Sequence, residues 1–132
     1  MIFQPQIVRT MKVIYNKYIP FGSFIAMTVG PFIFTKREVL TPVTVQHEAI
    51  HWEQQKETLI LPFFILYGLM FVYEYIRCLF NSDRGYVYHK LNTVFKRAYR
   101  HIAFEREAYR NEEIQFYVEH RRHYAWLKKY SA

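Results

Sequence analysis

The chain has 132 residues, a length that suits one domain built around a single hydrophobic core. Hydrophobic residues make up 52% of the chain and aromatic residues 20%, which excludes an intrinsically disordered protein. The only cysteine is Cys78, so an intrachain disulfide and a cysteine-rich zinc site are both excluded.

The formal net charge of +7 favours an anionic partner, such as an acidic membrane surface or a nucleic acid. Much of this charge lies in three basic pairs: Lys96-Arg97, Arg121-Arg122 and Lys128-Lys129. No nucleic-acid-binding motif accompanies them, so solvated helix faces are the simpler interpretation and we expect no nucleic-acid partner. The first twenty residues lack the apolar run and cleavage site of a signal peptide, which predicts a cytoplasmic or membrane-associated protein.

Three short runs rich in β-branched and aromatic residues are expected to form strands near the start of the chain. They are Val13–Tyr15, Phe24–Val29 and Phe32–Thr35. The breakers Pro20–Ser23 and Gly30-Pro31 separate them. A small antiparallel sheet is the simplest arrangement for such runs.

A helix is predicted to begin at Thr41-Pro42, because threonine is a good N-cap and proline suits the first helical position. Helical spacing of its apolar and histidine residues continues to about Glu57, and the helix should stop before Pro62.

A very hydrophobic helix is expected next, from about Pro62 to Phe80. Its most apolar part, residues 59–73, is shorter than the roughly 20 residues that a membrane-spanning helix needs. Burial in the core, or insertion into one leaflet of a membrane, is therefore favoured over a full span.

The last third of the chain is predicted to be helical after a loop at Asn81–Gly85. One long helix is expected from about Val87 to His120, and a short one over Tyr124–Tyr130. The fold class is therefore α+β and mainly helical, with all 132 residues in one domain.

The most specific pattern in the chain is His47-Glu48-Ala49-Ile50-His51. Two histidines four residues apart lie on the same face of a helix, so both imidazoles can reach one metal ion. The glutamate between them then lies beside a water that completes the coordination. This H-E-x-x-H spacing is typical of zinc metallopeptidases.

A catalytic zinc usually has three protein ligands, so a third ligand is needed. The apolar stripe of the long predicted helix passes through Ala98 and Ile102, and its next member is Glu105. An inward carboxylate is costly unless it is paired or bound to metal, which favours Glu105 as the ligand over a simple pairing with arginine. Glu107 lies about 200° further round the helix and cannot share the site in the same way.

The first motif, together with Phe104-Glu105-Arg106-Glu107-Ala108, resembles the gluzincin type of zinc metallopeptidase. The similar stretch covers roughly residues 26–111. In that group the third ligand is a glutamate three residues before an alanine, which implies Glu105 here. Many relatives have an acidic residue or asparagine where this chain has Tyr109. One of Glu107, His101 or Glu112 is therefore expected to orient a ligand histidine.

The resemblance implies a zinc-dependent peptidase that acts on a peptide or protein, in which Glu48 is the general base toward a metal-activated water. Tyr109 and His101 are the candidates for stabilising an oxyanion. Gln54 lies on the same helix face as both histidines and either lines the cleft, bonds a ligand, or only links two helices. The resemblance also implies that the Phe24–Val29 strand pairs with an extended substrate.

Two other functions remain open from the sequence. One is a protein that binds zinc structurally without catalysis, although Glu48 has no purpose in such a site. The other is a basic interaction module for membranes or nucleic acids in which the H-E-x-x-H pattern is accidental.

Overall fold

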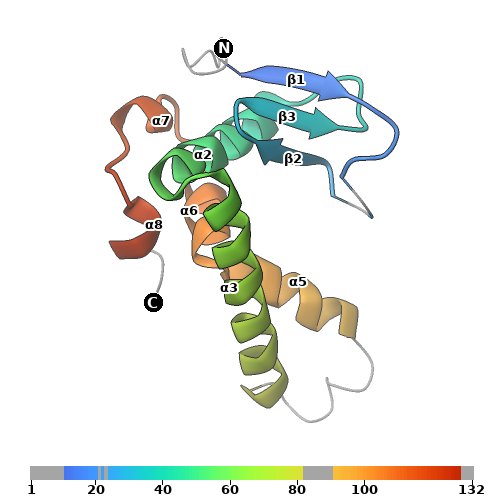
Figure 1. The fold of residues 1–132 in the computed structure, drawn as a ribbon, viewed down its shortest axis with the longest axis vertical. Helices are drawn as coiled ribbons and strands as arrows, with labels where there is room; N and C mark the ends of the chain where they lie inside the picture. Colours follow the sequence, from blue (N-terminus) through green and yellow to red (C-terminus); the bar gives the residue numbers. More distant parts are fainter. Residues whose placement is uncertain (1–10, 21, 23, 82–90, 129–132) are drawn as a thin grey trace.

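The computed structural model describes residues 11–128 apart from Phe21, Ser23 and residues 82–90. It is an α+β fold in which a three-stranded sheet is followed by helices (Figure 1). The strands are β1 (Lys12–Tyr15), β2 (Ala26–Val29) and β3 (Phe32–Thr35), in the order β1-β3-β2.

The sheet is mixed, so the predicted all-antiparallel arrangement is wrong for β1. β2 and β3 form an antiparallel hairpin that places Met27 opposite Phe34, and Gly30 makes its turn with a φ of +60°. β1 instead runs parallel to β3, with Val13 opposite Ile33. The connection over residues 16–25 is long enough to carry the chain across to the far edge of β3, and short strand patterns carry no signal for that choice.

Helix α2 (Pro42–Thr58) begins as predicted, because Thr41 Oγ1 accepts a hydrogen bond from Thr44 N at 3.1 Å. It ends at Leu59, whose φ of +70° breaks the helical path. Helix α3 (Ile60–Asn81) starts directly afterwards, with Pro62 in its first turn, where no hydrogen bond is lost.

The single long helix predicted over residues 87–120 is wrong, because the described part of it is broken twice. Helix α5 (Leu91–His101) is separated from α6 (Ala103–Asn111) by Ile102, which has an extended ψ of 134°. A left-handed Phe116 (φ +62°) precedes α7 (Tyr117–His120).

Burial gives a physical reason for the first break. Ile102 is fully buried and packs with Phe63, Phe104 and Trp126, so the chain bends around it. The bend lets α5 pack along α3 while α6 packs on α2. The last described helix, α8 (Ala125–Lys128), begins one residue after its predicted start. Asn81, the first residue of the predicted loop, instead ends α3. The rest of that loop, the predicted helix start at Val87 and the end at Tyr130 lie outside the described residues.

Two hydrophobic clusters form the core, and the first of them fixes α2 between the sheet and α6 (Figure 1). The first joins the sheet to α2 and the C-terminal helices through Met11, Ile33, Ala49, Ile50, Ala108 and Val118. The second joins α3, α6 and α8 through Phe63, Ile102, Ala103, Phe104 and Trp126. The helix with both histidines is therefore fixed on two sides.

Most of the surface of the hydrophobic helix α3 lies outside the core. Of the described helices, only Ile60–Phe80 is long and apolar enough to cross a bilayer, by length and composition. Only 17% of its most apolar window is buried in the protein. The expected alternative of simple burial in the core therefore fails for most of this helix.

We expect Ile50→Ala to lower the free energy of unfolding by about 2–4 kcal/mol, because it empties a fully buried position on α2. Val39→Ala is the matched control, since Val39 is 81% exposed, and its change should stay within about 0.5 kcal/mol. Urea denaturation of both variants measures the difference, and equal midpoints would contradict the assigned core.

Candidate metal centre

Three predicted ligands from two helices meet in the interior. His47 and His51 lie one turn apart on α2, and α6 brings Glu105 to them. The Nε2 atom of His47 is 3.0 Å from Glu105 Oε1, and the Nε2 atom of His51 is 3.1 Å from Glu105 Oε2. One ligand atom from each residue lies within 4.8 Å of the other two. The site therefore presents two imidazole nitrogens and a carboxylate to one point.

Each histidine ring also has a hydrogen-bond partner at its Nδ1 atom. His47 Nδ1 lies 2.6 Å from Glu112 Oε2, and His51 Nδ1 lies 2.8 Å from Gln54 Oε1. Both oxygens can only accept, so both Nδ1 atoms donate their protons to them. This leaves the Nε2 atom of each ring for the shared point next to Glu105. Metal-binding histidines are commonly oriented in this way, so the residues present fit a zinc ion.

In the metal-free protein the two histidines share the negative charge of Glu105. Burial opposes protonation of His47, but its hydrogen bonds to Glu105 and Glu112 outweigh this and raise its pKa to about 10. Burial also opposes protonation of His51, yet Glu105 raises its pKa above the usual value. The pKa of Glu105 lies well below its usual range, because both histidines outweigh the effect of burial. Glu105 therefore stabilises positive charge on the imidazoles that surround it.

Glu48 lies beside this centre and is 6% exposed. Thr28 on β2 donates a hydrogen bond from Oγ1 to Glu48 Oε1 at 2.7 Å and a second one to the Glu48 carbonyl at 3.1 Å. β2 therefore fixes the position of this carboxylate.

Two tyrosines complete the immediate surroundings. Tyr67 on α3 donates to Glu105 Oε2 at 2.6 Å, so its hydroxyl is committed to the third ligand. The Tyr109 ring meets the His47 ring edge-on, with centroids 4.6 Å apart, and Arg100 lies 4.0 Å over the Tyr109 ring. The pKa of Tyr109 is raised by burial and by Glu105, so its hydroxyl is neutral at physiological pH.

His101 lies elsewhere, although the sequence made it a candidate for the surroundings of the ligands. It ends α5, and its Nδ1 is 4.0 Å from Glu74 Oε2. The break at Ile102 separates His101 from the helix that carries Glu105. His101 is therefore not one helical turn before Glu105 on the same helix.

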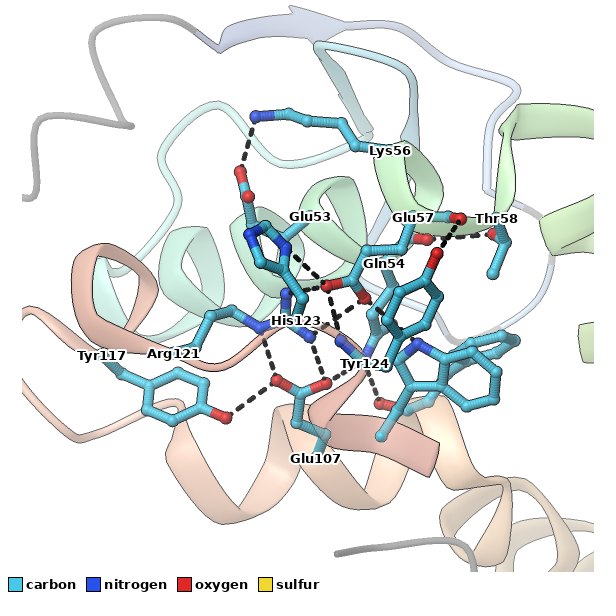
Figure 2. Close-up of polar contacts among 12 residues, drawn as sticks. Glu53, Gln54, Lys56, Glu57, Thr58, Glu107, Tyr117, Arg121, His123 and Tyr124 are labelled. Atoms are coloured by element: carbon cyan, nitrogen blue, oxygen red, sulfur yellow. Dashed lines mark hydrogen bonds and ion pairs between the residues drawn. The ribbon is translucent and has the colours of Figure 1, made fainter. Parts of the chain in front are cut away.

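A second buried polar network supports the centre from the other side of α6 (Figure 2). Gln54 Nε2 donates to Glu107 Oε1 at 3.0 Å, and Arg121 donates to both oxygens of Glu107 at 2.7 and 2.8 Å. The same guanidinium donates to Glu57 Oε2 at 2.8 Å. Arg121 and both carboxylates are buried, and the pair of acids raises the pKa of Arg121. The C-terminal segment is thereby tied to α2 and, through Gln54, to His51.

Gln54 therefore has two of the roles expected from its position: it bonds a ligand histidine and it links α2 to α6. Sequence reasoning missed the roles of Thr28, Tyr67 and Arg121. For Tyr67 the available signal was its helical spacing from Phe63 and Glu74 on α3, which places polar groups among apolar ones.

Two cavities open on either side of Glu48. One, of about 390 Å³, is mainly apolar, reaches His51 and Glu105, and has Phe24, Phe63, Phe64, Phe71 and Phe95 among its walls. The other, of about 580 Å³, is more polar and reaches His47, with Lys96, Arg100, Tyr109 and Glu112 in its walls. A ligand in either cavity can therefore approach Glu48 and one of the two histidines.

Comparisons with models of known protein families, with curated proteins and with solved structures find no match for this chain.

We expect Glu112→Gln to weaken zinc binding about 10–100-fold, because the charged acceptor behind His47 is lost while its shape is kept. Glu113→Gln is the matched control, since its side chain is exposed and adjacent in sequence. Competition with a chromophoric chelator measures both affinities. Equal affinities for the two variants would remove Glu112 from the site.

The pH dependence of stability should have opposite signs with and without zinc. His47 has a pKa of about 10 in the folded protein against an ordinary value of 6.5. Its stabilising effect is therefore complete below pH 6.5 and is lost as pH rises through 10. With zinc bound, stability should instead increase from about pH 6 to about pH 8, because the imidazoles must release protons to bind the ion. Thermal melts with chelator and with zinc test this, and the same trend in both would contradict it.

Proposed function

We propose that this protein is a gluzincin-like zinc peptidase, with the ion held by His47, His51 and Glu105 and with Glu48 as the general base. The observation that carries this proposal is the convergence of three buried ligand atoms within 4.8 Å, beside a second carboxylate, that of Glu48, which is held separately. No further histidine, cysteine or acid belongs to this group among the described residues. Three protein ligands favour catalysis, because structural zinc sites are usually closed by four.

Zinc, when bound, would supply Lewis-acid activation of a water and of the scissile carbonyl. Thr28 holds Glu48 Oε1, so Glu48 Oε2 is the oxygen that we assign to proton transfer. The carboxylate takes a proton from the attacking water and returns it to the leaving nitrogen. The hydroxyl of Tyr109 is our candidate donor to the oxyanion, because the ring of Tyr109 packs edge-on against His47, whereas the Tyr67 hydroxyl is bonded to Glu105.

The position of β2 supports an extended peptide or protein segment as substrate. β2 is an edge strand of the sheet. Gln55 already donates to the Thr28 carbonyl and accepts from the Gly30 N–H near the hairpin turn, so an added strand would pair with the Ala26 end of this edge. Ala26, Met27 and Thr28 of this strand line the apolar cavity that reaches Glu48. A peptide paired with β2 would therefore run past the general base.

Glu48→Gln should lower peptide hydrolysis at least about 100-fold and leave zinc affinity within about threefold, because it removes a proton acceptor and no ligand. A quenched fluorescent peptide mixture reports hydrolysis, and elemental analysis reports bound zinc. Full activity in this variant would reject the assignment of Glu48.

Glu53→Gln is the matched control on the same helix. Glu53 pairs with Lys56 at 2.6 Å, away from the cavities, and its loss should not change hydrolysis. Chelation should abolish wild-type hydrolysis and added zinc should restore it. A wild-type protein that binds zinc but cleaves no peptide would favour a structural zinc site instead.

A further inference from the structure

One face of α3 forms a long apolar stripe that nothing in the described protein covers. Its members are Leu61, Ile65, Leu69, Val72, Tyr73, Ile76 and Phe80, and they are between 48% and 83% exposed. At 100° per residue they fall within about 120° of the helix circumference. The stripe from residue 61 to residue 80 is about 28 Å long, since an α-helix rises 1.5 Å per residue. We call these seven residues the outward stripe.

The opposite face of α3 faces the rest of the protein. Phe63 and Glu74 on that face are buried, and Phe71 contacts Phe95 of α5 with ring centroids 5.0 Å apart. The outward stripe therefore points away from the protein body. An apolar surface of this length and continuity marks an interaction site on a protein surface.

The charges on α3 and on its neighbour α5 identify the kind of partner. The described residues of α3 and α5 carry four cationic side chains, Arg77, Lys96, Arg97 and Arg100. Their only acid is Glu74, which is buried and paired with Arg77 at 2.9 Å. These two helices and the whole chain, at +7, are therefore positive and match an anionic surface. The same charge opposes a second copy of the chain as the partner.

The apolar cavity of the metal centre adjoins this surface. Phe64, Gly68 and Phe71 line the cavity from the flank of α3 next to the stripe. Phe24 and Phe95, each 39% exposed, also line it. An apolar group can therefore pass from the stripe to the cavity along one continuous apolar surface.

We propose that the outward stripe lies on an anionic lipid bilayer, with α3 in the plane of the interface. An in-plane helix buries its apolar face about 5–10 Å below the headgroups and keeps its polar partners in water. A spanning α3 would carry the cations of α5, which packs along it, into the hydrocarbon, and charges there are costly. This inference does not depend on the proposed peptidase activity.

Flotation of the full chain with lipid vesicles tests the partner. Vesicles with equal parts of phosphatidylglycerol and phosphatidylcholine should bind at least about tenfold more protein than phosphatidylcholine alone, because the cations add to apolar insertion. The triple variant Leu69→Gln, Val72→Gln, Ile76→Gln should reduce binding at least about tenfold. These side chains are exposed, so circular dichroism should show an unchanged fold.

A second triple variant, Val13→Gln, Val39→Gln, Ile114→Gln, is the matched control. It also replaces three exposed apolar residues, but none lies on α3, and it should float like the wild type. Failure of the wild type to float, or equal losses in both triple variants, would overturn the proposal. So would a stable lipid-free dimer that only the stripe variant dissociates.

Depth measurements distinguish an in-plane helix from a spanning one. In a Cys78→Ser background, single cysteines at Leu61, Leu69 and Phe80 can carry a fluorophore that brominated lipids quench. Similar shallow depths at all three positions support the in-plane arrangement. A Leu69 label at the bilayer centre with shallow labels at both ends would overturn it.

Discussion

The burial of one carboxylate, that of Glu105, is the constraint on which the structure most depends. An isolated charge of this kind would be very costly in the interior, so it requires partners from every side. His47 and His51 supply them from α2, and Tyr67 supplies one from α3. Three helices therefore meet at one side chain. The candidate metal centre is thus part of the core rather than an addition to a finished fold.

Helix α6 carries acids to two different buried centres. Glu105 turns toward the histidines, and Glu107, two residues later, turns toward Arg121 on the other side of the helix. Gln54 joins the two centres, since it bonds His51 with its oxygen and Glu107 with its nitrogen. A change in the C-terminal segment can therefore reach a ligand histidine through hydrogen bonds alone. The stability of the fold and the geometry of the site share the same polar contacts.

Local patterns predicted the parts of the structure that depend on local rules. The cap at Thr41, the helix over the two histidines and the hydrophobic helix all follow from neighbouring residues, and the structure confirms them. Glu105 was rightly placed inward, although the continuous helix behind that argument is broken at Ile102. The zinc ion itself stays a prediction.

The features that the sequence did not predict depend on contacts between residues that are far apart in the chain. The parallel pairing of β1 is decided by which edge of β3 is free, and strand propensity does not record this. Arg121 lies fourteen residues after Glu107 and reaches it only because the chain turns back at a left-handed Phe116. A continuous helix through that turn, as the sequence predicted, would not bring Arg121 to Glu107.

The position of Arg121 near the C-terminal end has a consequence for how the protein matures. During synthesis the chain leaves the ribosome from its N-terminus, so His47, His51 and Glu105 emerge before the guanidinium that neutralises Glu107 and Glu57. Until that residue arrives, two acids on α2 and α6 repel each other where the helices should pack. Close packing of α2 on α6 with both acids ionised therefore needs the segment that carries Arg121.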